Sequence, residues 1–348
     1  MRAHGTGDGT DDAAGLPPGT HVRVLTDGKA GDEEQCLGVA EALGVAAEVR
    51  RVAPRAPFAW LMPWGPIDPR ERSRSAGSPI APPFPDLAIA SGRRAVPYLQ
   101  ALKRASGGRT LTVYLKDPRT GPRTADLIWA PTYDRVRGDN VVTTLTSPHR
   151  ISAPRLAEAR AAADPRLMAL PHPRAAVLVG GDSRHSRWTP EDVARFASDL
   201  DALAGSGVSL MGTMSRRTAQ SDPTLKTRVE AIFAAHGGFL WDGTGDNPYV
   251  QLLALADAIV VTADSVNMVG EAAATGRPVL VFKPTWRTPK GPRSYALVAG
   301  LEREGVVHAF NGRLEGEAYE PLNSTPVIAG AIACAYARHR RALGLAAP

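Results

Sequence analysis

Short apolar runs alternate with longer segments of helical period along most of the chain. In the first half the apolar runs cover residues 22–26, 45–52, 87–90, 111–115, 127–130 and 141–144, and helical segments lie near residues 33–43 and 94–103. Short apolar runs separated by helical segments are typical of parallel strands joined by crossover helices. The pattern predicts an α/β fold with a Rossmann-like unit in the first half.

The second half repeats this alternation. Its apolar runs cover residues 175–179, 208–212, 238–241, 258–262 and 278–282. The segment from Thr189 to Asp192 reads threonine, proline, glutamate, aspartate, which is the order of a helix cap, a first-turn proline and acidic first-turn residues. A last helix is expected from Thr325 to about Arg341. We therefore predict a second Rossmann-like domain.

These halves define four expected segments. Residues 1–20 contain Gly, Asp and Thr but no apolar stretch, so we expect a disordered leader and no signal peptide. The expected N-terminal domain covers residues 21–165, the C-terminal domain residues 172–322, and a C-terminal helix residues 323–348. The segment between the two domains, DPRLMALPHPR, is interpreted as a linker.

Composition narrows the class of protein. The 348 residues carry a formal net charge of +6, and the two cysteines, Cys36 and Cys334, form no cluster suited to zinc. The basic excess is mild and forms no stripe with interleaved aromatics, so we expect no nucleic-acid partner. No apolar stretch approaches the roughly 18 residues that span a bilayer. We expect a cytoplasmic protein, with peripheral contact to the inner face of the membrane as an open alternative.

Small and polar residues follow the expected strands, where backbone N–H groups converge on the carboxyl edge of a parallel sheet. After the first strand come Asp27, Gly28, Lys29 and Gly31, whose glycines allow a tight turn and whose lysine could meet an anion. An ordinary turn is the other interpretation. Asp27 is a candidate to activate an acceptor group.

Two loops of the second half are candidate phosphate sites. Gly181, Asp182, Ser183 and His185 follow its first strand, where little side-chain bulk would hinder a diphosphate; His185 is either an acceptor-activating group or a solvated loop residue. The next loop contains the pair Arg216 and Arg217, whose guanidiniums suit phosphate geometry but are also common on plain surfaces.

The most informative loop follows the strand at residues 258–262. Asp264 or Ser265 can cap the next helix and expose its N-terminus to an anion, with Asn267 in its first turn. Glu271, about two turns in, lies where it can accept hydrogen bonds from ribose hydroxyls, or it is a solvated helical carboxylate. The preceding segment 241–249 either lies beside a base or is a plain connection.

Motifs in both halves resemble the bacterial members of the mitochondrial-fission "elongated mitochondria" family, over residues from about 21 to 310. The motifs that carry the resemblance are LTDGKAGDEEQCLGVAEALG, ASGRRAVPYLQALKR, LKDPR, VRGDNVVTTLTSPHR, VLVGGDSRHSRW, TMSRRT and DGTGDNPYVQLLALADAIVVTADSVNMVGEAAATGRPV. The E-x-x-x-x-G-x-P element that starts at Glu271 is also similar to the donor domain of GT-B glycosyltransferases, notably the peptidoglycan N-acetylglucosaminyltransferases.

The resemblance implies a GT-B-like fold, in which two Rossmann-like domains face a cleft and the second binds a nucleoside-diphosphate sugar. In plants it implies a role in recruiting fission machinery to the mitochondrial surface. Where the family usually has a histidine after the first glycine turn, this chain has Asp32 and Glu33. The positions that match the shared motifs are Gly28, Gly31, Gly181, Asp182, Ser183, Arg216, Arg217, Asp264, Ser265, Asn267 and Glu271.

We therefore expect a glycosyltransferase that uses a nucleotide sugar as substrate and has no bound cofactor. No metal ion is expected, because the phosphate loops contain no DxD motif or His/Asp cluster with ligand spacing. A nucleotide-sugar epimerase and a non-catalytic peripheral membrane scaffold remain alternatives.

Trp60 and Trp64 lie in an apolar, proline-bearing segment that is flanked by arginines. Tryptophan beside arginine suits the headgroup boundary of an anionic membrane. The other interpretation is that the segment packs over its own domain as a cover.

Overall fold

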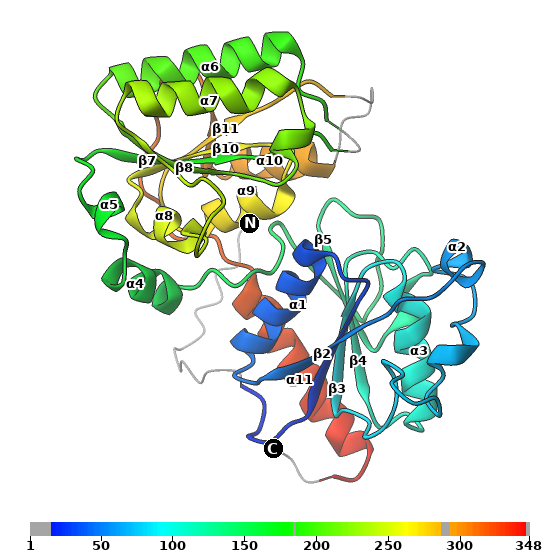
Figure 1. Ribbon diagram of the computed structural model, residues 1–348. Helices are drawn as coiled ribbons and strands as arrows, with labels where there is room; N and C mark the ends of the chain where they lie inside the picture. Colours follow the sequence, from blue (N-terminus) through cyan, green and yellow to red (C-terminus); the bar gives the residue numbers. More distant parts are fainter. Residues whose placement is uncertain (1–14, 184–185, 287–292, 346–348) are drawn as a thin grey trace, which may run out of the picture. The chain divides into compact units, whose positions relative to one another are not determined.

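The computed structural model describes residues 15–183, 186–286 and 293–345, and its contacts divide the chain into two compact units. Unit 1 contains the chain up to Trp129, Val136–Val142 and the segment from Thr325 onward. Unit 2 contains Ala130–Arg135 and Thr143–Ser324. Figure 1 shows an α/β arrangement in each unit, with helices packed on a sheet.

Unit 1 is built on a sheet of order β2-β1-β3-β4-β5-β6. The β1–β2, β1–β3, β3–β4 and β4–β5 pairs are parallel. Every residue of β1, β3, β4 and β5 is buried, as expected of a parallel sheet covered on both faces. Its elements are β1 (Val22–Thr26), α1 (Ala30–Ala42), β2 (Ala47–Arg51), α2 (Phe58–Leu61), η1 (Pro69–Glu71), β3 (Leu87–Ser91), α3 (Ala95–Ala105), β4 (Leu111–Leu115), η2 (Pro122–Thr124), β5 (Leu127–Pro131) and β6 (Val141–Thr144).

The last helix of the chain, α11 (Thr325–Ala342), completes unit 1 and not unit 2. Its buried residues Ile328, Ile332 and Tyr336 share one apolar core with Val39 and Leu43 at the end of α1. Figure 1 shows α11 alongside α1 in this unit. The two ends of the sequence therefore build one core.

Unit 2 has a sheet of order β12-β11-β10-β7-β8-β9, and each neighbouring pair is parallel. Two apolar cores, one on each face, use alternate residues of β7 such as Ala176 and Val177. Its elements are α4 (Ala153–Ala161), α5 (Pro165–Met168), β7 (Arg174–Val179), α6 (Pro190–Gly205), β8 (Ser209–Met214), η3 (Thr218–Gln220), α7 (Pro223–Ala235), β9 (Phe239–Leu240), α8 (Tyr249–Leu255), β10 (Ala258–Thr262), α9 (Val266–Ala273), β11 (Val279–Phe282), α10 (Arg293–Arg303) and β12 (Val307–Ala309).

The two sheets confirm the predicted fold class of two Rossmann-like parallel-sheet units. The boundaries of the units differ from those of the expected domains. Residues 143–165, expected in the first domain, belong to unit 2 because α4 packs against α8, where the Arg160 guanidinium donates to the carbonyl oxygen of Ala254 at 2.8 Å. Of the expected leader, residues 1–14 lie outside the described residues. Leu16 is packed in the unit 1 core, and its N–H donates to Leu43 O at 2.9 Å.

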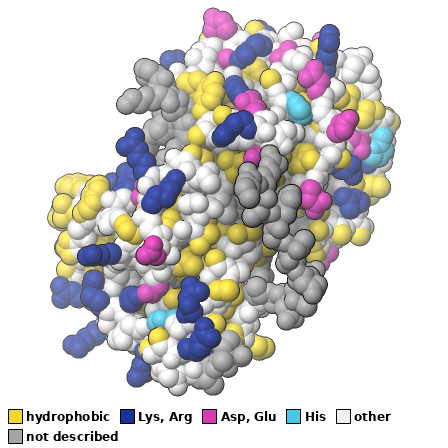
Figure 2. Space-filling view, turned by 180° about the vertical axis from the view of Figure 1, so that it is seen from behind, with side chains coloured by type: hydrophobic (Ala, Val, Ile, Leu, Met, Phe, Trp, Pro, Cys, Tyr) yellow, Lys and Arg dark blue, Asp and Glu magenta, His cyan; other side chains and the backbone are white. Residues whose placement is uncertain are grey.

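Within the described ranges, no helix is both long enough and apolar enough to cross a membrane. Figure 2 shows Lys and Arg side chains scattered among acidic, apolar and neutral ones on the visible face.

The α11 contact predicts a clear difference between two aliphatic residues of the same helix. Ile332→Ala should lower the free energy of unfolding by about 2–5 kcal/mol, because it leaves a cavity in the unit 1 core. Val327→Ala, at a residue that is 60% exposed, should change it by no more than about 0.5 kcal/mol. Urea unfolding followed by circular dichroism measures both. Equal effects would contradict the packing of α11 in unit 1.

Candidate functional site

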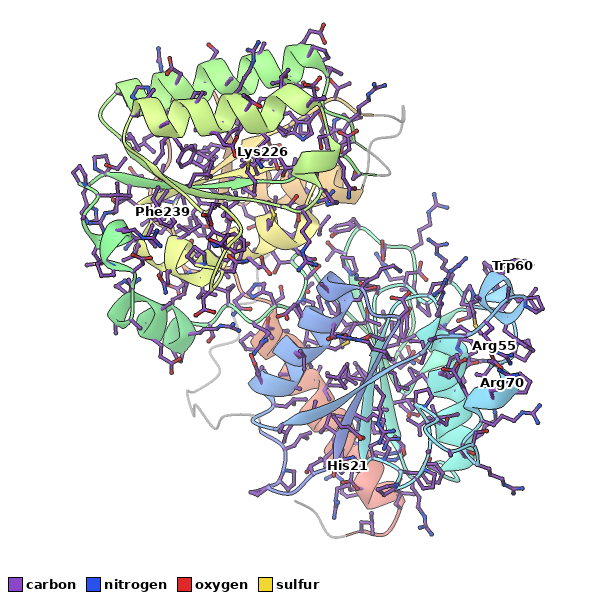
Figure 3. The ribbon with its side chains drawn as sticks, viewed as in Figure 1. His21, Arg55, Trp60, Arg70, Lys226 and Phe239 are labelled. Carbon is purple, nitrogen blue, oxygen red and sulfur yellow. The ribbon has the colours of Figure 1, made fainter. Side chains whose placement is uncertain are left out.

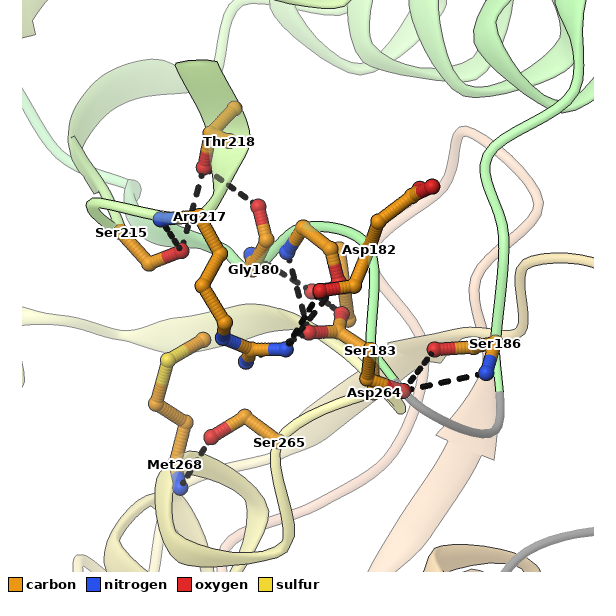
Figure 4. A network of polar contacts seen from close by, with 12 residues as sticks. Gly180, Asp182, Ser183, Ser186, Ser215, Arg217, Thr218, Asp264, Ser265 and Met268 are labelled. Carbon is orange, nitrogen blue, oxygen red and sulfur yellow. Dashed lines mark hydrogen bonds and ion pairs between the residues drawn. The ribbon is translucent and has the colours of Figure 1, made fainter. Parts of the chain in front are cut away.

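The carboxyl edge of the unit 2 sheet is organised around the buried carboxylate of Asp264, the second residue after β10 (Figure 4). Its side chain has no solvent-exposed surface. Oδ2 accepts from the N–H of Gly181 at 3.0 Å and from Nη2 of Arg217 at 2.9 Å, and Oδ1 accepts from the hydroxyl of Thr262 at 2.6 Å. Burial raises the pKa of Asp264, against the opposing effects of these donors. The carboxylate ties together the loops that follow β7, β8 and β10.

The glycines after β7 let the backbone approach this carboxylate. A Cβ built on Gly180 would lie 2.1 Å from Oδ2 of Asp264, and one built on Gly181 would lie 2.4 Å from the carbonyl carbon of Arg217. The Gly180 N–H donates to the hydroxyl of Thr262 at 2.8 Å. The loop was expected to offer its amides to a diphosphate. The structure gives those of Gly180 and Gly181 protein partners, so the glycines serve close packing of the chain on itself.

Asp182 and Ser183 also take part in the structure of their own loop. The Asp182 N–H donates to Ser221 Oγ at 2.6 Å, and its Oδ1 accepts from the N–H of Trp188 at 2.9 Å. Ser183 Oγ lies 2.7 Å from Ser186 Oγ and accepts from the N–H of Ser186 at 3.0 Å. His185, a predicted acceptor-activating residue, lies outside the described residues.

The two adjacent arginines after β8 differ in role. The Arg217 guanidinium pairs with Asp264 and also donates to the carbonyl oxygens of Gly181 and Asp182, both at 3.2 Å. Arg216 is exposed, and among the described residues no carboxylate pairs with its guanidinium. Arg217 therefore holds the loops together, whereas the side chain of Arg216 is exposed on the same loop.

Helix α9 presents the third group of predicted residues. Ser265 is its N-cap, and its hydroxyl accepts from the N–H of Met268 at 3.4 Å. The first amides of a helix have no partners within the helix, so an anion near Ser265 and Asn267 would be favoured there. Glu271 lies farther along α9 and accepts a hydrogen bond from the hydroxyl of Tyr249 at the start of α8. Glu271 is therefore oriented by a neighbouring helix and is not a simply solvated carboxylate.

A polar pocket of about 480 Å³ lies beside the loop after β9. Trp241 lines it, with its indole N–H donating to the carbonyl oxygen of Thr244 at 2.7 Å. Arg166 and Phe239 also line the pocket, and the Arg166 guanidinium lies 4.9 Å from the centroid of the Phe239 ring. Pro248 and Gln251, on either side of Tyr249, also line the pocket, so it adjoins the helix whose tyrosine contacts Glu271.

Unit 1 carries a second candidate group, at the carboxyl ends of β1 and β3. The Asp27 side chain is 5% exposed, and its Oδ2 accepts from Nζ of Lys29 at 2.8 Å. Its Oδ1 is buried and has no hydrogen-bond donor among the described residues. Gly92 has φ +93°, and a Cβ there would lie 2.8 Å from this oxygen. Gly28, which follows Asp27, also has a positive φ of +82°.

Gly31 lies in the first turn of α1, beside Asp32 and Glu33, the residues that occupy the family's histidine neighbourhood. Asp32 pairs with Nζ of Lys116, which follows β4 and has φ +95°. Glu33 accepts from Arg51 Nη2 at 2.9 Å, and this contact lowers the pKa of Glu33. Both carboxylates therefore have cationic partners. No role for Lys116 was predicted from the sequence, although this lysine lies in the LKDPR motif.

A family model described as "Mitochondrial fission ELM1" matches residues 30–336 of the chain.

The chain belongs to this ELM1 family.

Two curated relatives are similar over part of their length. The mitochondrial fission protein ELM1 of Arabidopsis thaliana is 30% identical over 276 residues, which is 69% of this chain and 61% of the relative. An uncharacterized protein of Rickettsia prowazekii is 28% identical over 163 residues, or 44% of each chain. The match therefore spans about three fifths of the plant ELM1 protein and less than half of the Rickettsia protein.

Solved structures similar to this ELM1-family chain are more distant in sequence. The structure of S. aureus MnaA with UDP is 14% identical with a TM-score of 0.48, over 94% of this chain and 98% of the other. The UDP-GlcNAc 2-epimerase of Neisseria meningitidis bound to UDP-GlcNAc is 13% identical with a TM-score of 0.45, over 94% of each chain.

The Asp264 contacts predict a large effect of one substitution. Asp264→Ala should lower the free energy of unfolding of this ELM1-family protein by about 3–5 kcal/mol, because it leaves the Arg217 guanidinium without its carboxylate partner and the Gly181 N–H without its acceptor. Asp264→Asn should cost less, since an amide oxygen can still accept from both. Asp246→Ala, an exposed control, should change the value by no more than about 0.5 kcal/mol. Urea unfolding checks the series, and a loss in Asp264→Ala no larger than in the control would refute the structural role.

Proposed function

We propose that this ELM1-family chain is a metal-independent glycosyltransferase that uses a nucleoside-diphosphate sugar, with the nucleotide bound by unit 2. The observation that carries the proposal is the α9 arrangement, in which Ser265 caps the helix and Glu271 is held by Tyr249. A helix N-terminus favours the diphosphate, and a fixed carboxylate favours the ribose hydroxyls. These two groups suit two chemically different parts of one ligand.

The remaining parts of a nucleotide also have places in unit 2. Arg216 is exposed on the loop after β8 and supplies a guanidinium for the diphosphate. The pocket beside Trp241 adjoins α8 and offers an aromatic ring and main-chain groups to a base. We place the base there and infer that it is uracil.

The proposed reaction is a transfer of the sugar to a hydroxyl acceptor. The acceptor oxygen forms a bond to the anomeric carbon, the bond from that carbon to the diphosphate oxygen breaks, and the nucleoside diphosphate leaves. The first turn of α9 and Arg216 stabilise the negative charge that develops on the leaving diphosphate. The acceptor proton goes to a carboxylate base.

We assign the base to Asp27 of unit 1. Its Oδ1 is buried without a donor among the described residues, so an acceptor hydroxyl would supply a hydrogen bond that the protein does not. Gly92 keeps this oxygen free of a neighbouring side chain. Asp27→Asn should therefore abolish transfer while nucleotide affinity, which belongs to unit 2, stays unchanged.

The ribose contact predicts a selective loss of affinity. Glu271→Ala should weaken the binding of UDP about tenfold, because hydrogen bonds from the ribose hydroxyls to a charged carboxylate are lost. The binding of inorganic diphosphate, which has no ribose, should stay nearly unchanged. Isothermal titration measures both ligands. Glu230→Ala, at a half-exposed carboxylate on α7, is the matched control and should behave as the unmodified protein. UDP affinity that survives Glu271→Ala would overturn the ribose assignment.

Metal independence is tested separately. In the described part of the chain, no group of three or more His, Cys, Asp or Glu residues could hold a metal ion. We expect UDP affinity to be the same with EDTA and with added magnesium. If EDTA abolishes binding and magnesium restores it, the phosphate charge is neutralised by an ion and the assignment to α9 and Arg216 is wrong.

A nucleotide-binding scaffold without turnover is the second candidate function. It is favoured by the loop after β7, where the amides of Gly180, Gly181 and Asp182 have protein partners and so do not face a leaving group. Release of UDP from UDP-sugars with a panel of hydroxyl acceptors separates the candidates. Tight UDP binding without any release would favour the scaffold.

A further inference from the structure

Unit 1 exposes two tryptophans on one short segment. Trp60 is 77% exposed and Trp64 is 70% exposed, and Leu61 between them is half exposed. We call these three residues the indole patch. Large aromatic side chains are usually well buried in soluble proteins, so two exposed indoles on one short segment require an explanation. The structure exposes both indoles, while Met62 of the same segment is buried.

The indole patch is held in place by a folded segment and is not a loose loop. The Trp60 N–H donates to Pro57 O at 3.0 Å, and the Trp64 N–H donates to Leu61 O at 3.0 Å. Met62, between the tryptophans, is fully buried and anchors the segment in the unit. The folded segment therefore holds the two indoles in their exposed orientation.

An ion pair between the partly exposed Arg55 and the buried Asp68 holds the next part of the segment in place. The Arg55 guanidinium donates to both oxygens of Asp68, at 2.7 Å each, and this contact lowers the pKa of Asp68. The Asp68 N–H donates to the Tyr98 hydroxyl of α3, and that hydroxyl contacts Glu71. The two acidic residues between positions 51 and 74 therefore both have protein partners.

The surface around the patch is positively charged. Residues 51–74 contain five arginines against these two acidic residues. Arg70, Arg72 and Arg74 are exposed, and no carboxylate of the described residues pairs with them. Figure 3 places Trp60, Arg55 and Arg70 at the same outer edge of unit 1, and Figure 2 shows hydrophobic side chains bordered by Lys and Arg at one edge of the molecule. Arg74 and Arg104 also line an open groove of about 770 Å³.

We propose that the indole patch inserts into the headgroup boundary of an anionic lipid bilayer, with Arg70, Arg72 and Arg74 contacting lipid phosphates. Indoles favour this boundary because they combine an apolar body with a polar N–H, and arginines near it are attracted to anionic lipid. The charge complementarity selects a lipid surface over a protein partner. The proposal is independent of turnover by the enzyme, since it uses residues of unit 1 alone.

Co-sedimentation of the full chain with vesicles tests the proposal. The protein should bind vesicles of phosphatidylcholine mixed with phosphatidylglycerol, bind phosphatidylcholine alone much more weakly, and lose affinity as salt rises. Trp60→Ala with Trp64→Ala should reduce partitioning at least about tenfold, because the inserted apolar area is removed. Arg70→Gln, Arg72→Gln and Arg74→Gln together should reduce it about 100-fold, since each arginine contributes about fivefold.

A matched variant separates the patch from general electrostatic attraction. Arg228→Gln, Arg313→Gln and Arg338→Gln remove the same charge from exposed positions elsewhere and should change partitioning much less. An equal loss in this variant, or unchanged binding by the double tryptophan variant, would overturn the proposal. So would a lack of binding to anionic vesicles by the unmodified chain, which is the result expected if the patch binds a protein.

A fluorescence measurement distinguishes the loss of membrane contact from the loss of folding. Trp60→Gln and Trp64→Gln, made singly, should keep the thermal transition of the unmodified protein because both side chains are exposed. In the unmodified protein, brominated lipid in anionic vesicles should quench tryptophan fluorescence, and each single variant should lose part of that quenching. Quenching that is the same in all three proteins would place other tryptophans at the membrane and refute the assignment.

Discussion

The carboxylate of Asp264 is the constraint on which the edge of unit 2 depends. It is fully buried, and it accepts from three donors, which come from the loops after β7 and β8 and from Thr262 at the end of β10. A buried charge with a single missing donor is costly, so each loop must adopt the conformation that supplies its donor. The close approach at Gly180 and Gly181, the inward turn of Arg217 and the position of Thr262 all follow from this requirement. The turn after β10 is fixed in the same way, and with it the start of α9.

Residues that resemble phosphate ligands in a sequence can instead form hydrogen bonds within the protein around such a buried carboxylate. Arg217 and the amides of Gly180, Gly181 and Asp182 are donors that would suit a diphosphate, but each has an acceptor within the protein. Arg216 and the first turn of α9 lie outside this set of contacts. The loop network and the proposed nucleotide site are therefore neighbours with different tasks, since one fixes the backbone and the other offers groups to a ligand.

The strands of both sheets could be predicted from the sequence because buried parallel strands are short, apolar runs. The runs at residues 22–26, 111–115 and 258–262 coincide with β1, β4 and β10. The core that α11 joins could not be predicted, since an apolar helix face does not reveal which core it will pack against. In the structure, α11 packs in the core of the unit formed by the other end of the chain. The different contacts of Arg216 and Arg217 could not be predicted from the sequence either, because two adjacent arginines differ only in the residues that the fold places next to each of them. The motif histidine His149 is buried, which lowers its pKa to about 4, so it is a neutral core residue despite its place in a family motif.

The two units differ in what their sheet edges leave unsatisfied. In unit 2 the buried carboxylate has three donors, and its charge is used to hold loops. In unit 1 the carboxylate of Asp27 is nearly as buried, but only one of its oxygens has a donor among the described residues, and a glycine of positive φ stands against the other. A carboxylate whose oxygens already accept from protein donors has little room for an acceptor hydroxyl, whereas an oxygen without a donor can accept a hydrogen bond from that hydroxyl directly. This difference is the physical reason to assign chemistry to Asp27 and architecture to Asp264, although both follow a strand at the same kind of sheet edge.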